Sequence, residues 1–563
     1  MESLPQHLRK YIVDQNYQKY TPIDQAVWRY VLRQLRNFLK THAHSCYLDG
    51  LEKTGIDVEK IPNIDAISAK LKLFGWRALP VSGFIPPAAF MELQSLGVLP
   101  IASDMRSIDH LLYTPAPDIV HEAAGHAPIL IQPEYADYLR QYAQVAKKAI
   151  LSHQDLEQYE AIRVLSDLKE NPNSTAEEIA DAEENLNFVS NSITSISEAS
   201  ELSRMNWWTA EYGLIGDTDN YKLFGAGLLS SIGESKFCIT DKVKKIPFSI
   251  KCVQQGYDIT EPQPQLFVAK DFKHLVDVLH QMAAGMAYKI GGIRGLDKAI
   301  KAKSLNTVQL DTGIQISGIL EKYTLDSSGH IAYLQFAGPS QISYADKELA
   351  GHDKNYHVQG YGTPLGDLID QDLLKLTVGK NYFLKYTSGV QVDGVLEKVV
   401  KLSKTAQILT FNKATCTLKN KMIFKPAWGL FDIVVGKKVT SVFGGPADRG
   451  AYGETTDFVA SKISAPIYTD AQKKLFQVYQ SVRDMRTDKK ITQAAFEKVF
   501  KKVKAEGSNE WLLYVELLEI CIANKLADSS KAELNNQLEL LKSKDEKINN
   551  LITAGINLSH EFK

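Results

Sequence analysis

The sequence predicts a multidomain α+β protein in three parts: a mostly helical domain with short strands over residues 1–305, a β-rich domain over residues 306–455, and a helical region over residues 456–563. Three observations lead to this prediction. The chain has 563 residues, too many for one ordinary hydrophobic core. Apolar residues recur at helical spacing in the first half and near the end. Between them, short alternating apolar stretches are separated by Gly, Asp and Ser, as in β-hairpins.

The composition indicates a soluble globular protein without a nucleic-acid or membrane partner. Hydrophobic residues make up 44% of the chain and the formal net charge is -1, so no basic field favours nucleic acid or an anionic membrane. The N-terminus lacks the basic and apolar regions of a signal peptide. The cysteines form no CxxC pair, which is typical of a reducing compartment, so we expect a cytoplasmic protein. They are Cys46, Cys238, Cys252, Cys416 and Cys521.

Residues 1–75 are expected to be helical. Thr21-Pro22 has the form of a helix start, because threonine is a good N-cap and proline suits the first helical position. Apolar residues then recur at roughly helical spacing: Ala26, Tyr30, Leu32, Leu35 and Leu39. Residues 77–101 contain three prolines and a glycine in their first part, which predicts an irregular loop. Such loops often carry ligand contacts, but composition alone favours a plain connector.

Residues 132–210 are expected to be strongly helical, and residues 214–305 to mix short strands and helices. Ser174 and Glu177 have the spacing of a capping box. The polar stretch 171–200 predicts an exposed helical hairpin with a solvated face. Gly225-Ala-Gly227 suggests a phosphate-binding loop, but neither GxGxxG nor GxxxxGKS is present, so we reject that function.

The β-rich region contains an internal repeat. Residues 313–322 match residues 389–398 at six of ten positions, and three of the other four are Ile-to-Val exchanges. Each copy is followed by a second strand-like run, which ends at Phe336 in one copy and at Phe411 in the other. The sequence therefore predicts a duplicated β unit (313–336 and 389–411), two halves of a pseudo-symmetric barrel or sandwich.

The last region carries apolar residues at alternating spacings of four and three: Leu534, Leu538, Leu541, Ile548 and Ile552. Asp545 stands where the pattern requires one more apolar residue. The pattern covers fewer heptads than a coiled coil needs, so we favour an amphipathic helix packed on the surface.

The stretch from Tyr113 to Pro128 carries the chemistry. His121 and His126 lie five residues apart, with an acid beside the first and Gly125 before the second. In the zinc-protease motif HExxH the histidines are four apart and share one helix face. Histidines five apart differ by about 140° around a continuous α-helix, so both reach one metal only if the helix stops between them. Gly125 and Pro128 predict that break.

Two histidines and one carboxylate on one face of an octahedron describe the iron site of non-haem Fe(II) oxygenases. Two histidines alone make a metal site about as probable as ordinary hydrogen-bonded histidines. Spacing does not choose the carboxylate, for which the candidates are Asp118, Glu122, Glu211 and Glu234. Asp118, three residues before His121, is also placed to hydrogen-bond a ligand.

Five segments of the chain resemble the pterin-dependent aromatic amino acid hydroxylases. They occur in the order of that family, and the resemblance runs from about Tyr11 to about Gly295, roughly half the chain. It implies that residues 1–305 form the catalytic domain of such an enzyme. The segments are Pro80–Gly83, Tyr113–Asp118, His121–His126, Trp207–Gly213 and Phe224–Glu234.

The resemblance implies roles for individual residues. His121, His126 and Glu211 are expected to ligate Fe(II), and Glu122 and Glu211 to act in catalysis. A tetrahydropterin (tetrahydrobiopterin or a related reduced pterin) is expected to contact Gly83, Phe84, Ile85, Phe90 and Glu122, with Phe90 stacking on its ring. Arg106 matches the arginine that binds the substrate carboxylate, a pairing that suits a planar guanidinium. The remaining substrate-pocket residues are Thr114, Pro117, Trp207, Ser230 and Glu234.

The sequence also departs from the family. A tyrosine is familiar just before the position of Trp207, and here it is Asn206. The segment between His126 and Glu211 is longer than in the animal enzymes. A short tetramerisation tail is replaced by the long region after residue 305, so the layout resembles a long bacterial form.

The leading hypothesis is an enzyme that hydroxylates the ring of phenylalanine to give tyrosine, with Fe(II), O₂ and a tetrahydropterin. Tryptophan hydroxylation is the alternative within the family, and a zinc hydrolase with Glu122 as base is a distant one. Residues 306–563 support two expectations equally: an assembly module through which the protein forms a homo-oligomer, and a regulatory module. His352 and His357 are also five apart, but without a carboxylate-rich or helix-breaking context we interpret them as surface histidines.

Overall fold

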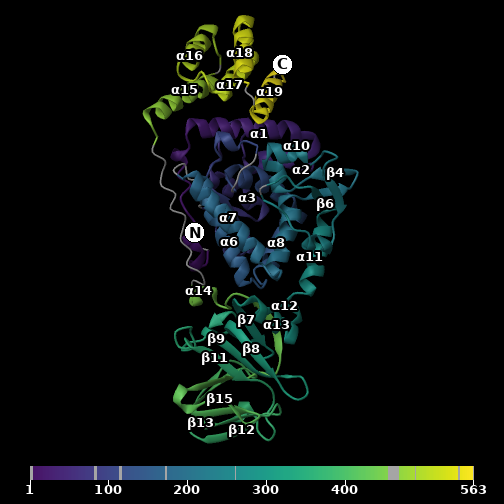
Figure 1. Ribbon diagram of the computed structural model, residues 1–563, viewed down its shortest axis with the longest axis vertical. Helices are drawn as coiled ribbons and strands as arrows, with labels where there is room; N and C mark the ends of the chain where they lie inside the picture. Colours follow the sequence, from purple (N-terminus) through teal and green to yellow (C-terminus); the bar gives the residue numbers. More distant parts are fainter. Residues whose placement is uncertain are drawn as a thin grey trace.

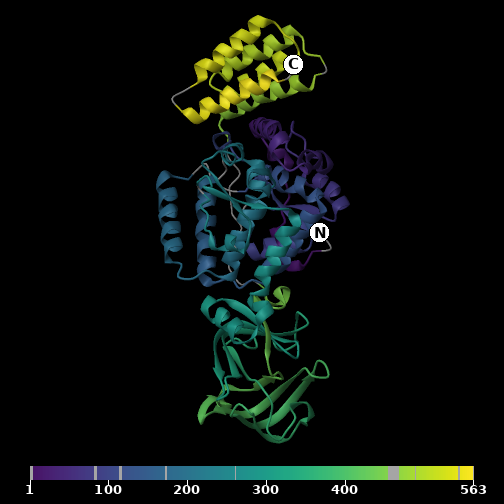
Figure 2. The ribbon, with the colours of Figure 1, turned by 90° about the vertical axis from the view of Figure 1, so that its right-hand side faces the viewer.

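The computed structural model in Figure 1 is elongated, and three groups of elements follow one another along its longest axis. Helices from residues 470 to 560 lie at one end, a mixed part up to residue 302 lies in the middle, and strands from residues 305 to 444 lie at the other end. The 90° view in Figure 2 keeps this order. The structure describes residues 4–81, 85–112, 117–170, 174–259, 261–453, 468–488, 490–542 and 545–561.

The first long helix begins where the sequence predicts. In α1 (Pro22–His42) the Thr21 hydroxyl accepts from the Asp24 N–H, and the Asp24 carboxylate accepts from the Thr21 N–H. The five apolar residues that predicted this helix are buried, and so is every residue from Gln25 to Leu35, so α1 is enclosed on all sides over this stretch. Two shorter helices follow, α2 (Cys46–Thr54) and α3 (Ile64–Leu71).

Residues 77–102 do not begin with the predicted irregular loop. They form strand β1 (Arg77–Val81), helix α4 (Pro87–Ser95) and strand β2 (Val98–Ala102), and the strands pair in parallel. The prolines fit because each strand of a two-stranded sheet is an edge strand, which tolerates Pro80, and because Pro87 stands at the start of α4. The pair leads the chain toward the histidine stretch.

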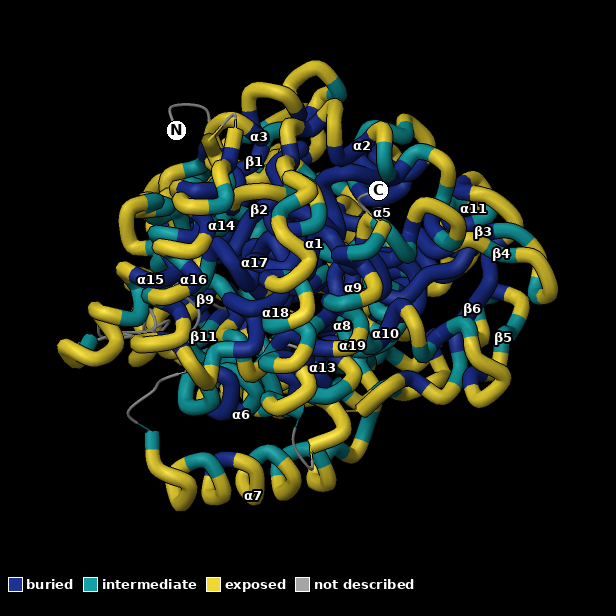
Figure 3. Tube along the Cα trace, turned by 90° about the horizontal axis from the view of Figure 1, so that it is seen from above, coloured by how far each residue is buried: buried dark blue, intermediate teal, exposed yellow. Residues whose placement is uncertain are grey.

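The segment 132–210 is helical, as predicted. It contains α5 (Pro133–Ala146), α6 (His153–Glu170), α7 (Ala176–Ser192) and α8 (Glu198–Asn206). The predicted hairpin over residues 171–200 is wrong in its bounds, because the described part of this stretch holds α7 and only the start of α8, and α7 forms its hairpin with α6. Figure 3 shows α7 at the periphery, mostly exposed. The predicted cap is wrong by one residue, because Thr175, not Ser174, forms the capping box, with Glu178.

A four-stranded sheet and short helices complete the middle part. The sheet order is β4-β3-β6-β5. None of the described helices combines the length and apolarity that crossing a membrane requires. The elements are β3 (Leu214–Asp217), β4 (Asn220–Leu223), α9 (Ala226–Ser230), α10 (Ile232–Phe237), β5 (Lys244–Pro247), β6 (Gln265–Ala269), α11 (Phe272–Ala284), α12 (Ala287–Ile290) and α13 (Gly292–Ala302).

The duplicated sequence forms matching strands in two sheets. In the first copy β7 (Leu305–Leu310), β8 (Ile314–Leu325) and β9 (Ile331–Tyr344) are neighbours, and in the second β12 (Asn381–Lys385), β13 (Val390–Lys401) and β14 (Gln407–Leu418) are neighbours. The pairings β8–β9 and β13–β14 both shift register around the repeated glycine, Gly318 in one copy and Gly394 in the other. The remaining elements are β10 (Lys347–Glu348), β11 (Gly360–Pro364), β15 (Lys421–Phe424), β16 (Phe431–Val434), β17 (Val439–Gly444) and α14 (Arg449–Tyr452).

The C-terminal helices are α15 (Asp470–Thr487), α16 (Gln493–Glu506), α17 (Trp511–Ala523), α18 (Asp528–Leu541) and α19 (Glu546–His560). The leucine and isoleucine pattern that suggested one amphipathic helix spans two helices, so that prediction is wrong in its length. Asp545, the polar residue in the missing slot, is the N-cap of α19 and accepts from the Lys547 N–H. Leu534, Leu538 and Ile552 are buried in the bundle.

The C-terminal helices dock on α1 through buried charges. Glu519 on α17 accepts hydrogen bonds from Arg29 and Arg33 on α1, and Arg486 on α15 lies 3.4 Å from the same carboxylate. Arg29, Arg33 and Glu519 are all buried. The Tyr30 hydroxyl donates to the backbone carbonyl of Leu551 on α19. One face of α1 therefore packs against the middle part, and another packs against the C-terminal helices.

Candidate metal centre

His121 and His126 lie on one turn of π-helix, Val120–His126. The predicted helix break at Gly125 is wrong. In a π-helix the hydrogen bonds run from i to i+5, so residues five apart stand above each other without any break. The N–H of Ala127 donates to the carbonyl of Glu122 in this pattern, and the histidine ring centroids lie 5.0 Å apart. A 3₁₀ segment that contains Pro128 continues the turn.

Gly125 serves close packing instead of helix termination. A Cβ atom at this position would lie 2.7 Å from the carbonyl oxygen of Ala226 and 3.0 Å from its Cβ. Ala226 begins α9, which packs directly on the π-helical turn. The glycine thus lets α9 approach the backbone that carries the two histidines.

Glu211 completes a three-residue group. It ends a second π-helical turn, Trp207–Glu211, and its carboxylate oxygens lie 3.2 Å from His121 Nε2 and 3.4 Å from His126 Nε2. One ligand atom from each of the three residues lies within 4.8 Å of the others. Of the four carboxylates that spacing alone allowed, Glu211 is the one that joins both histidines among the described residues.

The Glu211 carboxylate is held as an anion. Burial alone would raise its pKa, but the charge of His126 and hydrogen bonds from both histidines outweigh burial, so the pKa of Glu211 lies well below its ordinary value. Asn206 also donates to this carboxylate, at 3.4 Å. Sequence reasoning noted Asn206 only as a departure from the family and missed this contact.

Close approach of two backbone segments places Glu211. A Cβ on Gly225 would lie 2.4 Å from the Gly213 nitrogen and 2.5 Å from the Glu211 carbonyl oxygen. The Gly-Ala-Gly sequence, rejected above as a phosphate loop, therefore has a structural reason. It allows the segment before α9 to lie against the turn that carries Glu211.

Ser230 fixes the tautomer of His121. Its hydroxyl donates to the Ala226 carbonyl at 2.7 Å and lies 3.1 Å from His121 Nδ1. Because the single hydroxyl proton is committed to the carbonyl, the Ser230 oxygen accepts from His121 Nδ1–H. The hydrogen that Nε2 shares with Glu211 in the metal-free chain is then the one that a metal would replace, so His121 would bind the metal through Nε2.

Arg106 is buried in a bidentate pair with Asp118. Its Nε and Nη2 each donate to the Asp118 carboxylate at 2.7 Å, and Nη1 donates to the Ser230 carbonyl at 3.1 Å. Burial would raise the pKa of Asp118, but the Arg106 charge outweighs it and lowers the pKa. Asp118 also accepts from the backbone N–H of His121, so it does hydrogen-bond that residue, through the main chain. Among the described residues, two of the five guanidinium N–H groups stay available for a ligand.

Two further carboxyls near the site are buried and protonated more readily than usual. Burial raises the pKa of Glu122 to about 8 and that of Glu234 to about 7. Glu122 Oε2 and His126 Nδ1 have no hydrogen-bond partner among the described residues. Buried polar atoms without partners suit a site that a bound group completes, and the His–His–carboxylate set suits ferrous iron.

The other predicted binding residues are only partly placed. Ile85 and Phe90 pack with Leu8 and Leu93 in a small apolar cluster beside β1. Pro117 is exposed, and Ser230 and Glu234 are buried. The Trp207 ring lies between Tyr257, 4.2 Å away, and Tyr212, 4.6 Å away. Gly83, Phe84 and Thr114 lie outside the described residues.

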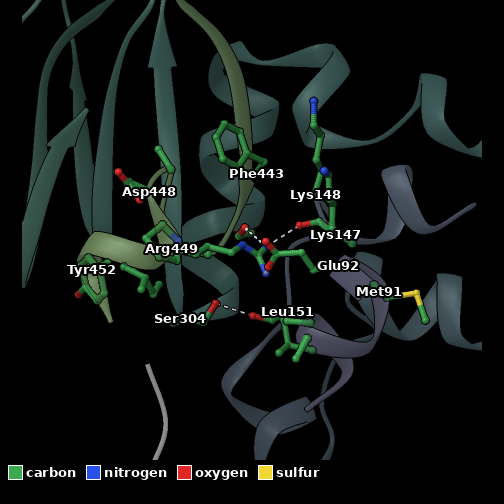
Figure 4. Close-up of a pocket in the computed structure, with 18 of the residues that line it drawn as sticks. Met91, Glu92, Lys147, Lys148, Leu151, Ser304, Phe443, Asp448, Arg449 and Tyr452 are labelled. Carbon is green, nitrogen blue, oxygen red and sulfur yellow. Dashed lines mark hydrogen bonds and ion pairs between the residues drawn. The ribbon is translucent and has the colours of Figure 1, made fainter. Parts of the chain in front are cut away.

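A cavity of about 1900 Å³ lies away from this centre. It lies in the seam between the middle part and the strands, where Figure 4 shows Glu92 from α4 facing Arg449 from α14. These two side chains lie 3.8 Å apart, and Arg449 also donates to the Lys147 carbonyl. His121, His126 and Glu211 do not line this cavity. The chemistry of the side chains, not cavity size, therefore identifies the centre.

Comparisons with known proteins cover the same half of the chain. The family described as biopterin-dependent aromatic amino acid hydroxylase matches residues 10–160 and 172–291. Phenylalanine-4-hydroxylase of Mesorhizobium japonicum is 31% identical over 271 residues, which span 47% of this chain and 82% of that protein. The Pseudomonas aeruginosa enzyme of the same name is 26% identical, over 48% of this chain and 86% of that protein. A Chromobacterium violaceum phenylalanine hydroxylase structure with iron(III) and 7,8-dihydrobiopterin has 24% identity and a TM-score of 0.38, over 49% and 85% of the two chains.

Proposed function

The chain belongs to the biopterin-dependent aromatic amino acid hydroxylases, and from this membership we propose that it hydroxylates the ring of phenylalanine to give tyrosine. Its relatives in Mesorhizobium and Pseudomonas are named for that reaction. Bound iron and a reduced pterin would supply the electrons that activate O₂, and residues of this chain would hold both groups beside the substrate.

The observation that carries the proposal is the His121–His126–Glu211 group. Two neutral imidazoles and one carboxylate hold Fe(II) while leaving coordination positions open for oxygen and substrate. The Ser230 hydroxyl orients His121, and Asn206 hydrogen-bonds Glu211. The three ligands come from two π-helical turns, and α9 packs against both of them.

Arg106 is proposed to bind the substrate carboxylate. Asp118 fixes the plane of the guanidinium, and the two remaining N–H groups suit a bidentate carboxylate. The Ser230 carbonyl ties the same guanidinium to α9, which also holds His121. The amino acid would therefore be anchored by a residue that is connected to the iron ligands by one serine.

The remaining site residues are proposed from family membership. Glu122 and Phe90, with Gly83, Phe84 and Ile85, would contact the pterin. Thr114, Pro117, Trp207 and Glu234 would line the substrate pocket. Trp207 is partly buried between two tyrosine rings, which gives that pocket one rigid aromatic wall.

The test is tyrosine formation by the purified full chain with Fe(II), O₂, phenylalanine and a tetrahydropterin. We expect tyrosine to form and pterin to be consumed. If phenylalanine stays unchanged while tryptophan is hydroxylated, the substrate proposal is wrong but the reaction class stands. No hydroxylation of any aromatic amino acid would overturn the whole proposal.

Glu211→Ala tests the ligand assignment separately. Because the Glu211 carboxylate supplies the one negative charge of the group, the variant is expected to lose bound iron and activity together. Glu184→Ala, on the exposed face of α7, is the matched control and keeps both. Iron content measured on the purified proteins decides the matter, and unchanged iron in Glu211→Ala contradicts the assignment.

For the rest of the chain, we propose domain limits at residues 305 and 455 and a structural role for the C-terminal helices. Their buried contacts with α1 support an intrachain cover over the catalytic part. A homo-oligomer through the C-terminal half is the other arrangement. Sedimentation of the full chain separates the two: a monomer supports the cover, and a concentration-independent oligomer supports assembly.

A further inference from the structure

A second group of potential metal ligands lies far from the first, in the β-rich region. His352, His357 and Asp432 each offer one ligand atom, and these atoms lie within 4.8 Å of one another. The prediction that the two histidines are surface residues is wrong: His352 is 3% exposed, His357 7% and Asp432 4%. Sequence reasoning missed them because the carboxylate is supplied by a strand 75 residues after His357, which no local context reveals.

The distance between the two imidazoles fits a shared ion. His352 Nδ1 and His357 Nε2 lie 3.2 Å apart. Two nitrogen ligands at about 2.0–2.1 Å from a tetrahedral metal are roughly 3.3 Å apart. A hydrogen bond between the rings gives the same distance, and Thr410 and Tyr356 hydrogen-bond the Asp432 carboxylate. The feature that points to an ion is that one atom of each of the three residues lies within 4.8 Å of the other two.

The surroundings orient the carboxylate and pack the rings. Thr410 Oγ1 donates to Asp432 Oδ1 at 2.6 Å, the kind of support that ligating carboxylates have. The ring centroids of Tyr356 and Tyr361 lie 4.7 and 5.0 Å from that of His357. Tyr356 is 47% exposed, so the group lies beside a residue that reaches the solvent.

The group connects the two sheets of the β-rich region. His352 and His357 lie between β10 and β11, which belong to the first sheet, while Asp432 lies on β16, which pairs with β14 in the second. The Tyr361 hydroxyl, on β11, donates to the backbone carbonyl of Asp432, so the two segments already touch. An ion held here would fasten the duplicated halves to each other.

We propose that His352, His357 and Asp432 form a second site for a divalent transition-metal ion, with Zn²⁺ as the fitting occupant. Two imidazoles and a carboxylate are ligands that zinc accepts, and zinc needs no redox partner. Three protein ligands leave one position for water or another small ligand. The ion would stabilise the β-rich region independently of the iron centre.

The test uses the metal-free full chain and titration with Zn²⁺ in the presence of a competing chelator that removes weakly bound metal. A double variant, His126→Ala with Glu211→Ala, eliminates the first centre and leaves the second intact. We expect this variant to bind one equivalent of Zn²⁺ tightly and to unfold at a higher temperature with zinc than without it. If it binds no tight zinc, the proposal is overturned.

Asp432→Asn, added to the double variant, keeps the shape of the side chain but removes its charge. We expect the resulting protein to bind no tight Zn²⁺. His330→Ala, which removes an exposed histidine of the same region, is the matched control and keeps it. Loss of zinc in the His330 variant, or retention in the Asp432 variant, contradicts the assignment. The proposed hydroxylase function does not enter this result, because the iron centre is absent from every variant compared.

Discussion

At the scale of single residues, the metal centre depends on the hydrogen bond between Ser230 and His121, which keeps a proton on His121 Nδ1. The Ser230 hydroxyl gives its own proton to the Ala226 carbonyl and so compels His121 to carry hydrogen on Nδ1. His121 then presents Nε2 to the metal without having to change tautomer. His126 has no such partner at its Nδ1 among the described residues.

We therefore predict that Ser230→Ala weakens iron binding by roughly 10- to 100-fold while the three ligands stay in place. The loss arises because His121 is no longer held in one tautomer and orientation. Iron dissociation constants measured by chelator competition test this. Ser235→Ala, a buried serine that bonds only within its own helix, is the control and should leave iron affinity unchanged. Equal affinity in both variants would contradict the role of Ser230.

Glu234 predicts a pH dependence of stability. Burial raises its pKa from 4.5 to about 7 in the folded chain. Below about pH 4.5 the Glu234 carboxyl is protonated in both the folded and the unfolded chain. Between pH 4.5 and 7 only the unfolded chain releases this proton, so the free energy of unfolding falls as the pH rises. Above about pH 7 both states have released it, and the contribution of Glu234 no longer changes. The full loss is at most about 3 kcal/mol.

Glu234→Gln is expected to remove this slope. The thermal unfolding midpoint of the metal-free protein, measured from pH 4.5 to 8, should decline less in the variant than in the parent chain. Glu184→Gln, at an exposed position, should behave as the parent does. Parallel curves for parent and Glu234→Gln would show that ionising this carboxyl costs the folded chain nothing.

Residue types were predictable from the sequence, and their contacts were not. The histidine pair was visible as a motif, and spacing left four carboxylates open, from which family resemblance selected Glu211. The contact of Ser230 with His121 could not be predicted, because it depends on how α9 packs. The contact of Asn206 with Glu211 depends on the π-helical turn between them, which the sequence did not reveal.

At the scale of elements, the π-helical turns explain why reasoning from helix periodicity failed at the site. An α-helix places residues five apart on different faces, so the sequence seemed to need a break at Gly125. The π-turn satisfies the same spacing by widening the helix. No local composition separates these two solutions. The elements themselves, α1 and the strands of the duplicated unit, follow from capping residues and alternating patterns that act locally.

Gly225 is the element-scale position most sensitive to change. Its missing Cβ admits the backbone of Gly213 and Glu211, so Gly225→Ala must push the Glu211 turn away from α9. We predict a loss of about 1–3 kcal/mol in unfolding free energy together with weaker iron retention. Gly256→Ala is the matched control, since its Cβ would meet nothing within 4 Å. Differential scanning calorimetry measures the stability of both variants, and metal analysis measures their iron content. If Gly225→Ala changes neither quantity, the packing argument is contradicted.

At the scale of the whole molecule, the buried charges between α1 and the C-terminal helices connect two parts that the sequence presents as separate. The region boundaries were suggested by changes in sequence texture, but nothing in the sequence shows that residues 511–523 meet residues 22–42. The contact joins Arg29 and Arg33 to Glu519, and no pattern in either helix predicts that these residues pair. Long-range pairing of this kind depends on the assembled shape.

Glu519→Ala is predicted to destabilise this docking by about 1.5–3 kcal/mol, because it removes the carboxylate that Arg29 and Arg33 share, while Arg29 keeps its contact with Glu59. Hydrogen exchange should then increase in α15–α19 while the core of the catalytic part stays protected. Glu533→Ala removes a half-exposed partner of Lys504 and should cost at most about 1 kcal/mol. Unchanged exchange in Glu519→Ala would show that apolar packing alone holds the helices.

The docking also means that α1 is synthesised long before the C-terminal helices that it contacts. Arg29 is 490 residues ahead of its partner Glu519. At about 5–20 residues per second, the ribosome needs roughly 25–100 seconds to supply that partner. For that interval Arg29 already has Glu59, 30 residues further along, but neither arginine has the Glu519 carboxylate. A message cut short before codon 519 would therefore yield a chain in which α1 lacks the anion that joins it to the C-terminal helices.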